Sequence, residues 1–576
     1  MNDVSRLEQA GDVTSALAAS RHLALQVPDR AEAARLAIDV ALRANRRQAA
    51  DTLVKTLRAK SSNSLAAAYA ATYVHFRRDR VTAARKAAAD LIERFPTNLR
   101  GAQLLAEIAT AQDDWAGAID VLKAVLQHHR QDARIHQQLA GLCWRTGEFE
   151  EVVTFARQAK DLGLDAAANT RLLGAALSQL NRHDEAVDVL REAHAVDPDH
   201  FETLALLSVA RVGMADVDGA MADVERALDL QPFSIRETPS ADGQRPFTVL
   251  ALENGSPALY VRSDFANYHL QNFISYLASP GLRIAHTPVT SNSVSRLAAS
   301  ELHPDVIVNN VVVGEIFDDA VLQHHRNIME LYGDVPVVNP PEAVIHCERV
   351  ENSRRFEGES GFIFPKTRHV NLDVMAFDDV LTLVETEFDW PILLRPPYTD
   401  EGIGMSLVDN ADSLREQIEA IELKNCLIIQ YHECRSLEGV GHQYRGLVIG
   451  DIAYVDRVNS FLDFQSHDNL RREAVWQKRG FDKIEQAFLA DPDSALGFDY
   501  KTVFAPIIER TPLDIFGFDF SITRDGRPIV FEVNASMNLF NKANAAWSPY
   551  LQDHYQFLND VVVDYLRSRA NAASTD

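Results

Sequence analysis

The stretch Ile515–Met537, IFGFDFSITRDGRPIVFEVNASM, predicts a β-hairpin. Its first half places a phenylalanine at every second position, which is the period of a strand. The Asp-Gly step at Asp525 predicts a tight turn, because this dipeptide favours the backbone conformation that hairpin turns need. Pro528–Val533 is then the returning strand.

Three oxygen donors gather on one face of this hairpin. Glu532 and Asn534 lie two residues apart and therefore point to the same side of their strand. Asp519 lies on the partner strand. Carboxylate and amide oxygens suit Mg²⁺, which usually also keeps water or nucleotide phosphates in its shell. An ordinary surface hairpin with polar residues remains an alternative at this point.

The order of these residues resembles the ATP-grasp enzymes, most closely the ribosomal-protein S6 glutamate ligases. The resemblance is carried by Gly517-Phe518-Asp519 on one strand and by Glu532-Val533-Asn534-Ala535-Ser536 on the other. It extends over roughly residues 339–560. It implies a carboxylate–amine ligase that uses ATP and Mg²⁺, with Asp519, Glu532 and Asn534 as metal ligands.

The same resemblance assigns phosphate-binding residues upstream. Arg349 matches the basic residue that reaches the ATP phosphates from a helix in the family. Arg395 ends a strand at which the family presents a lysine, and a guanidinium fork can also bind phosphate. Gly402 and Gly404 lie in the glycine-bearing loop that follows this strand and that folds over the phosphates in the family.

Further residues are assigned to the nucleotide and to catalysis. Gln430, Tyr431 and His432 follow an apolar strand and match the hinge that contacts adenine and the sugar. Arg445 matches a hairpin arginine that faces the γ-phosphate and acyl group, and Arg457 on the return strand is a second candidate. A cation there would stabilise charge that develops during phosphoryl transfer. The role of the loop 461–474 stays open.

A sequence repeat fills residues 1–232. A column of small apolar residues recurs there at a constant interval: Ala16, Ala50, Ala84, Ala118, Val152, Ala186 and Ala220. This interval of about 34 residues resembles the tetratricopeptide repeat, an all-α solenoid whose groove usually binds a peptide or protein. Self-association through the array, giving a homodimer, is the alternative. Tyr69, Tyr73 and Phe76 are expected either in the groove or in the core.

We therefore expect a multidomain chain. An all-α solenoid over residues 1–232 is followed by a polar linker at 233–245. Strands alternating with helices predict a parallel α/β domain, the pre-ATP-grasp domain of the resemblance, at 246–345. An α+β ATP-grasp domain is expected at 346–570.

Composition limits the class of protein. The chain has 576 residues, 46% hydrophobic and 24% charged, with a formal net charge of −25. This charge disfavours general binding to nucleic acid. No signal-peptide pattern and no apolar run of membrane-spanning length are present. The four cysteines lack metal-ligand spacing, which is typical of free thiols in a reducing cytoplasm.

The expected activity is ATP-dependent joining of a carboxylate and an amine through an acyl phosphate. The array would recruit a peptide or protein, and a small amine or carboxylate would be the second substrate. Two alternatives remain. One is a binding scaffold with a nucleotide-sensing or degenerate site, and the other is a kinase on the same fold.

Overall fold

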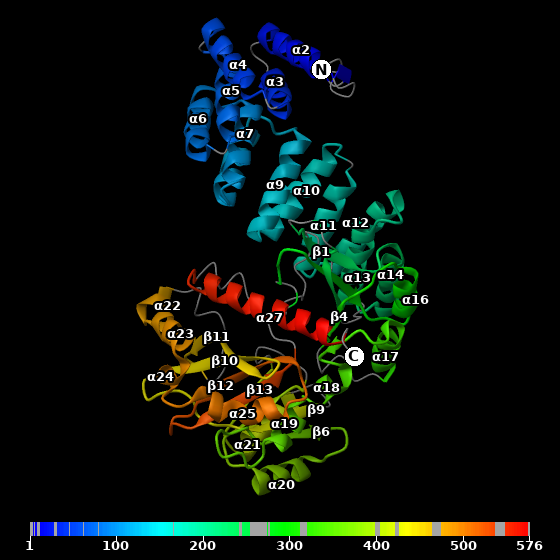
Figure 1. Ribbon diagram of the computed structural model, residues 1–576, viewed down its shortest axis with the longest axis vertical. Coiled ribbons are helices and arrows are strands. Elements are labelled where there is room, and N and C mark those ends of the chain that lie inside the picture. Colours follow the sequence, from blue (N-terminus) through cyan, green and yellow to red (C-terminus); the bar gives the residue numbers. More distant parts are fainter. Residues whose placement is uncertain are drawn as a thin grey trace. The chain divides into compact units, whose positions relative to one another are not determined.

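The computed structural model describes the chain apart from residues 1–3, 5, 8–11, 28–30, 45, 62, 79, 165, 241–242, 244, 254–273, 275–276, 312–318, 398–403, 421–424, 464–473, 536–547 and 574–576. The chain divides into two compact units, one comprising Met1–Ala227 and one beginning at Leu228. Figure 1 follows helices α2 to α14 from blue to green, and then the sheets and helices of the second unit up to α27 in red.

Helices α2 to α14 form the repeat array, two helices to a repeat. The first helices begin at a constant interval along the chain and are α3 (Ala31–Arg43), α5 (Leu65–Phe76), α7 (Leu99–Thr110), α9 (Ala133–Thr146), α11 (Ala167–Gln179) and α13 (Phe201–Gly213). The second helices are α2 (Val13–Gln26), α4 (Arg47–Lys60), α6 (Val81–Arg94), α8 (Trp115–Leu126), α10 (Phe149–Asp161), α12 (His183–Val196) and α14 (Val217–Leu230). The predicted all-α array is therefore confirmed.

Small residues allow the paired helices to approach closely. Every member of the repeat column from Ala16 to Ala220 is fully buried, Val152 included. At Gly174 on α11, an added Cβ would lie 2.5 Å from Cγ of Leu190 on α12. Tyr69 and Tyr73 of α5 are 2% and 1% exposed. Both tyrosines are thus core residues, whereas Phe76 is only partly buried.

A five-stranded sheet opens the second unit, in the order β1-β3-β2-β4-β5. Its strands are β1 (Ser234–Thr238), β2 (Phe247–Glu253), β3 (Leu282–Pro288), β4 (Val306–Asn309) and β5 (Val337–Val338). β2 pairs in parallel with β3 and β4, as does β4 with β5, and β1 is antiparallel to β3. The helices that follow strands are α16 (Ser293–Ala299) and α17 (Asp319–Tyr332). This sheet confirms the predicted α/β class.

The prediction that residues 233–245 form only a linker is wrong for the first half of that range. Ser234–Thr238 is strand β1, and its residues pair with Leu282–His286 of β3. The sequence FSIRETPS alternates between half-buried and exposed side chains there, as an edge strand does. The polar residues that suggested a linker lie on both sides of this strand, since Ser234, Arg236 and Thr238 are half-buried and Glu237 is exposed beside Ile235.

Two four-stranded antiparallel sheets complete the second unit. The first has the order β6-β9-β7-β8, with β6 (Thr367–Asn371), β7 (Ile392–Arg395), β8 (Ser406–Val408) and β9 (Asn425–Gln430). The second has the order β11-β10-β12-β13, with β10 (Gly441–Ile449), β11 (Ile452–Phe461), β12 (Ile515–Ile522) and β13 (Pro528–Asn534). The helices around them are α18 (Pro341–Ile345), α19 (Arg349–Arg355), α20 (Phe377–Glu387), α21 (Ala411–Ala420), α22 (Ala474–Lys478), α23 (Phe481–Ala490), α24 (Pro492–Leu496), α25 (Tyr500–Arg510) and α27 (Leu551–Ala573).

The two faces of the β11-β10-β12-β13 sheet have different coverings. Phe516, Phe518 and Phe520 pack on one face against α25, with Phe504 and Phe520 ring centroids 4.6 Å apart. On the other face Leu447 packs with Leu551 of α27. Helix α27 covers this face at one end of the strands. Arg445 lies two residues from Leu447 and therefore points to the same face of the sheet. Among the helices described, none has both the length and the hydropathy that a bilayer span requires.

Candidate functional site

The hairpin of β12 and β13 brings two carboxylates face to face. Asp519 pairs directly with Glu532, and Gly517 pairs with Asn534. The turn closes through the Thr523 amide, which donates to the Arg527 carbonyl at 2.8 Å. Because Glu532 and Asn534 lie two residues apart on one strand, all three oxygen-bearing side chains share one face of the sheet.

A row of four charged side chains crosses this sheet from β11 to β13. Arg457 lies opposite Arg445, Arg445 opposite Asp519, and Asp519 opposite Glu532. Side chains that lie directly opposite each other on neighbouring strands point to the same face. Two cations and two anions therefore stand side by side across four strands.

An arginine binds each carboxylate of the row. The Arg445 guanidinium donates to Asp519 through Nε to Oδ1 and through Nη2 to Oδ2, both at 2.7 Å. Gln443 Nε2 donates to Asp519 Oδ2 at 2.8 Å. Arg349 of α19 donates to Glu532 and, at 3.4 Å, to the carbonyl of Phe531. The Asp519 side chain is only 4% exposed, so this pairing takes place largely out of water.

The donor set fits Mg²⁺. Carboxylates directly opposite each other repel, and the two arginines supply the balancing charge. A divalent cation bound to Asp519, Glu532 and Asn534 would balance the same carboxylates with the oxygen ligands that Mg²⁺ prefers. In the described part of the chain, no three His, Cys, Asp or Glu side chains converge to hold a metal by themselves. The amide of Asn534, with water or phosphate, would therefore have to complete the shell.

Arg395 lies on the second antiparallel sheet, at the end of β7, and is 5% exposed. β8 returns antiparallel to β7, with Leu394 opposite Ser406. Gly404, just before β8, has φ +71°, and a Cβ there would lie 2.9 Å from Cγ of Pro396. Glycine is therefore required at this position for both backbone and spatial reasons. Gly402 lies outside the described residues.

The predicted hinge follows β9, the strand that leads from one antiparallel sheet to the other. The side chain of Gln430 braces the backbone of Asp389, accepting from its amide at 2.9 Å and donating to its carbonyl at 2.8 Å. That side chain is thus engaged within the protein. Burial raises the pKa of Tyr431 to about 12. Burial lowers the pKa of His432, which favours the neutral imidazole.

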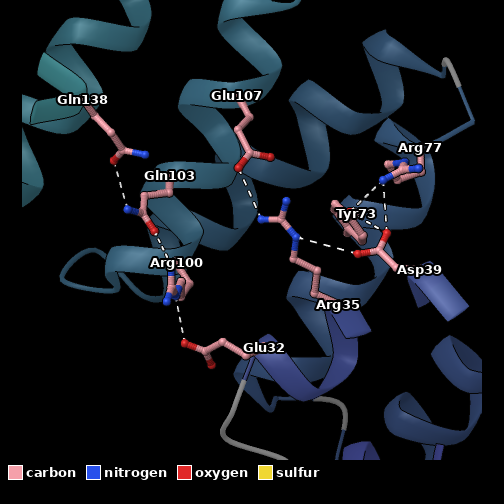
Figure 2. A network of polar contacts seen from close by, with 9 residues as sticks. All are labelled: Glu32, Arg35, Asp39, Tyr73, Arg77, Arg100, Gln103, Glu107 and Gln138. Atoms are coloured by element: carbon pink, nitrogen blue, oxygen red, sulfur yellow. Dashed lines mark hydrogen bonds and ion pairs between the residues drawn. The ribbon is translucent and has the colours of Figure 1, made fainter. Parts of the chain in front are cut away.

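The repeat array carries its own polar network (Figure 2). Arg35 of α3 contacts Glu107 of α7 at 3.3 Å, across the intervening α5. Arg100 of α7 donates to Glu32 of α3 at 2.8 Å. These hydrogen bonds join first helices that are two repeats apart. They can form only if the first helices converge on one side of the array. We call this side the inner face.

Comparisons with known proteins found the following similarities. A family model described as tetratricopeptide repeat matches residues 109–173. A D-alanine–D-alanine ligase of Staphylococcus carnosus (strain TM300) is 23% identical over 167 residues, which is 27% of this chain and 42% of that enzyme. The chain thus spans less than half the length of this curated relative.

Two solved structures show partial similarity to this chain. A MamA protein is 16% identical, with a TM-score of 0.28, and the match covers 29% of this chain and 91% of that one. A RimK domain protein ATP-grasp from Sphaerobacter thermophilus DSM 20745 is 15% identical, with a TM-score of 0.32, and the match covers 55% of this chain and 99% of that one. This chain joins a tetratricopeptide-repeat array to an ATP-grasp domain.

Two residues of the ATP-grasp sheet were not predicted as site residues. Gln443 contacts Asp519, and its place two residues before Arg445 on the same strand could have indicated this. Asp456 is fully buried beside Arg457, with Oδ2 3.8 Å from Nε. It occupies the irregularity where the β10–β11 register shifts, since Arg445 pairs with Arg457 but Gly446 with Val455. No sequence pattern marks such a bulge.

Proposed function

We propose that the chain is an ATP-dependent carboxylate–amine ligase that acts through an acyl phosphate. The observation that carries the proposal is the charge row across the ATP-grasp sheet. It offers two carboxylates for a divalent cation and, beside them, Arg445 and Arg457 for the transferring phosphoryl and acyl groups. Bound Mg²⁺ would neutralise phosphate charge.

Three arginines of the site have a defined part in this proposal. Arg349 and Arg395 orient the phosphates, and Gly402 and Gly404 belong to the loop beside them. The backbone after Gln430, with Tyr431 and His432, contacts adenine and sugar. Arg445 stabilises charge during transfer, because its planar guanidinium can present two donors to phosphate oxygens.

The array would recruit a peptide or protein substrate, with a small amine or carboxylate as the second substrate. Domain limits of 1–232, 246–345 and 346–570, the first range ending before β1, are part of this proposal. All four cysteines are free. We propose a cytoplasmic enzyme on this ground.

Hydroxylamine trapping tests the reaction class. Enzyme, ATP, Mg²⁺, hydroxylamine and a panel of amino acids and peptides should give a hydroxamate together with ADP, because hydroxylamine intercepts an acyl phosphate. A stable phosphorylated product without hydroxamate would identify a kinase. Nucleotide binding without any turnover would identify a sensing scaffold.

A matched pair of variants tests the site. Glu532→Gln should abolish most ADP release, because one anionic partner of the proposed cation is lost. Glu359→Gln is the control: Glu359 also pairs with an arginine, Arg510 at 2.8 Å, but away from the charge row. It should keep full turnover. Equal turnover in both variants would refute the metal assignment.

A further inference from the structure

The inner face of the array can be defined from contacts among the first helices. Arg35 reaches Glu107, Arg100 reaches Glu32, and Arg171 of α11 lies 3.4 Å from Glu202 of α13. Arg77 of α5 donates to Asp39 of α3 at 3.1 Å. Counted from the start of each first helix, these contacts use the second, fifth, ninth and thirteenth residues, and the constant repeat interval identifies the equivalent residues on the other first helices.

These positions carry more positive than negative charge. The arginines are Arg35, Arg43, Arg77, Arg100, Arg134, Arg145 and Arg171, and the acidic residues are Glu32, Asp39, Glu107 and Glu202. Each of the four carboxylates is paired with at least one arginine of the face, and Asp39 with two. The face is thus formally positive, on a chain whose Asp and Glu outnumber Lys and Arg by 82 to 57.

Two of these arginines, Arg134 and Arg145, lie on α9, and both side chains are exposed. Eleven residues correspond to three helical turns, so these arginines share one face about 16 Å apart along the axis. The Arg145 guanidinium lies over the Trp115 ring, 5.8 Å from its centroid, which helps to hold that fork in place.

At Gly141, between the two arginines, the surface of α9 is open. Gly141 lies seven residues after Arg134 and four before Arg145, and so on the same helix face. An added Cβ there would meet no atom within 4 Å. A glycine with open space above it lets another backbone approach closely. The stripe Arg134–Gly141–Arg145 therefore combines two cationic forks with room for a chain between them.

We infer that this stripe on α9 binds an acidic peptide segment, and hence that the array recruits an Asp- or Glu-rich partner. The inference rests on the proposed role of the array in recruitment. Arginine forks bind carboxylates in bidentate fashion. An extended chain advances about 3.3 Å per residue, so the two forks would hold carboxylates about five residues apart.

The test measures the binding of labelled peptides to the full chain, without ATP, by fluorescence anisotropy. The probes are labelled twelve-residue peptides with two Glu, two Lys or two Gln at positions five apart. The Glu peptide should bind most tightly, and its affinity should fall steeply with added salt because surface charges are screened. Equal affinity for all three peptides, or no binding of the Glu peptide at millimolar concentration, would overturn the inference.

Three variants locate the site. Arg134→Ala with Arg145→Ala should weaken binding of the Glu peptide at least tenfold. Arg191→Ala is the control, since Arg191 is an exposed arginine on the second helix α12. Gly141→Leu should block binding while leaving the helix at least as stable, because leucine is the better helix former. Unchanged binding in Gly141→Leu would show that the stripe is not the site.

This experiment is independent of the ligase proposal. Hydroxamate formation without Glu-peptide binding would retain the ligase and reject the acidic partner. Binding of the Glu peptide without hydroxamate formation would retain the acidic partner and reject the ligase.

Discussion

Arg445 and the proposed cation compete for the same carboxylate, and this leads to a prediction with two opposite effects. In the structure Arg445 makes two 2.7 Å bonds to Asp519, whose side chain is 4% exposed. Arg445→Met would remove both bonds and leave this carboxylate with the amide of Gln443 as a donor. The protein should then be less stable, yet hold a divalent cation more tightly.

The loss of stability can be estimated from the burial of the pair. Removing one partner of a buried ion pair costs about 3–5 kcal/mol. Because Gln443 still donates and Arg445 is 14% exposed, we expect the lower end of that range. Hydrogen exchange of the β12 and β13 amides measures this locally, without interference from the array.

The gain in cation affinity comes from charge. At an effective dielectric constant of 20, a divalent cation and a unit charge about 5 Å apart interact by roughly 7 kcal/mol. After allowance for solvent screening, we expect Mn²⁺, a spectroscopic substitute for Mg²⁺, to bind Arg445→Met at least about tenfold more tightly. Electron paramagnetic resonance of free Mn²⁺ measures this in the absence of nucleotide.

The control is Arg510→Met, which removes the partner of Glu359 at the surface. It should leave Mn²⁺ affinity unchanged. Mn²⁺ affinity that is equal or weaker in Arg445→Met than in the wild type would refute the reasoning, because Asp519 would then not be a ligand that Arg445 blocks.

Three further predictions concern the ATP-grasp half. Gly446→Ala should destabilise the folded state by about 1–3 kcal/mol, because the added Cβ would lie 2.3 Å from the Phe518 ring. Gly141→Ala is the control, since its added Cβ lies in open space, and it should not lower the melting temperature. A chain beginning at Pro232 keeps β1 and should resist urea better than one beginning at Gly243, which leaves β3 as an open edge; equal midpoints would contradict this. Burial raises the pKa of Asp456. The folded state therefore retains a proton that the unfolded state releases from about pH 4 upward, and stability falls as pH rises. Asp456→Asn should thus gain stability over the wild type as pH rises above about 4, where the unfolded carboxyl ionises, and a gap independent of pH would refute this.

The repeat array could be predicted closely because its signal is redundant. Each repeat places a small residue at the same depth, and close helix packing excludes larger ones, as the fully buried column from Ala16 to Ala220 confirms. The hairpin was predictable for a similar reason, since phenylalanines in alternation and an Asp-Gly turn agree. The chain's edge strand β1 was missed, because a half-exposed strand has few apolar residues to mark it.

The partners of the site residues could not be predicted. That Asp519 and Glu532 share a face follows from their spacing in the sequence. The two-pronged hydrogen bond from Arg445 to Asp519, in contrast, depends on which residue of β10 lies opposite Asp519. Register of this kind is fixed by the pairing of the whole sheet, not by the local sequence. The same holds for Gln430, whose side chain turned out to brace Asp389.

The charge row gives the ligand-free site a means of stability that also serves the proposed reaction. Asp519 and Glu532 lie directly opposite each other and are mostly shielded from water, so they require cationic neighbours. Arg445 and Arg349 supply that charge. If a divalent cation bound these carboxylates, as proposed, both guanidinium groups would lose these partners and could bind phosphate oxygens instead. Lysine could balance the charge equally well, but it could not make the planar, two-pronged bond to Asp519 and then offer the same geometry to phosphate. The choice of arginine at these positions therefore follows from the need to serve both states.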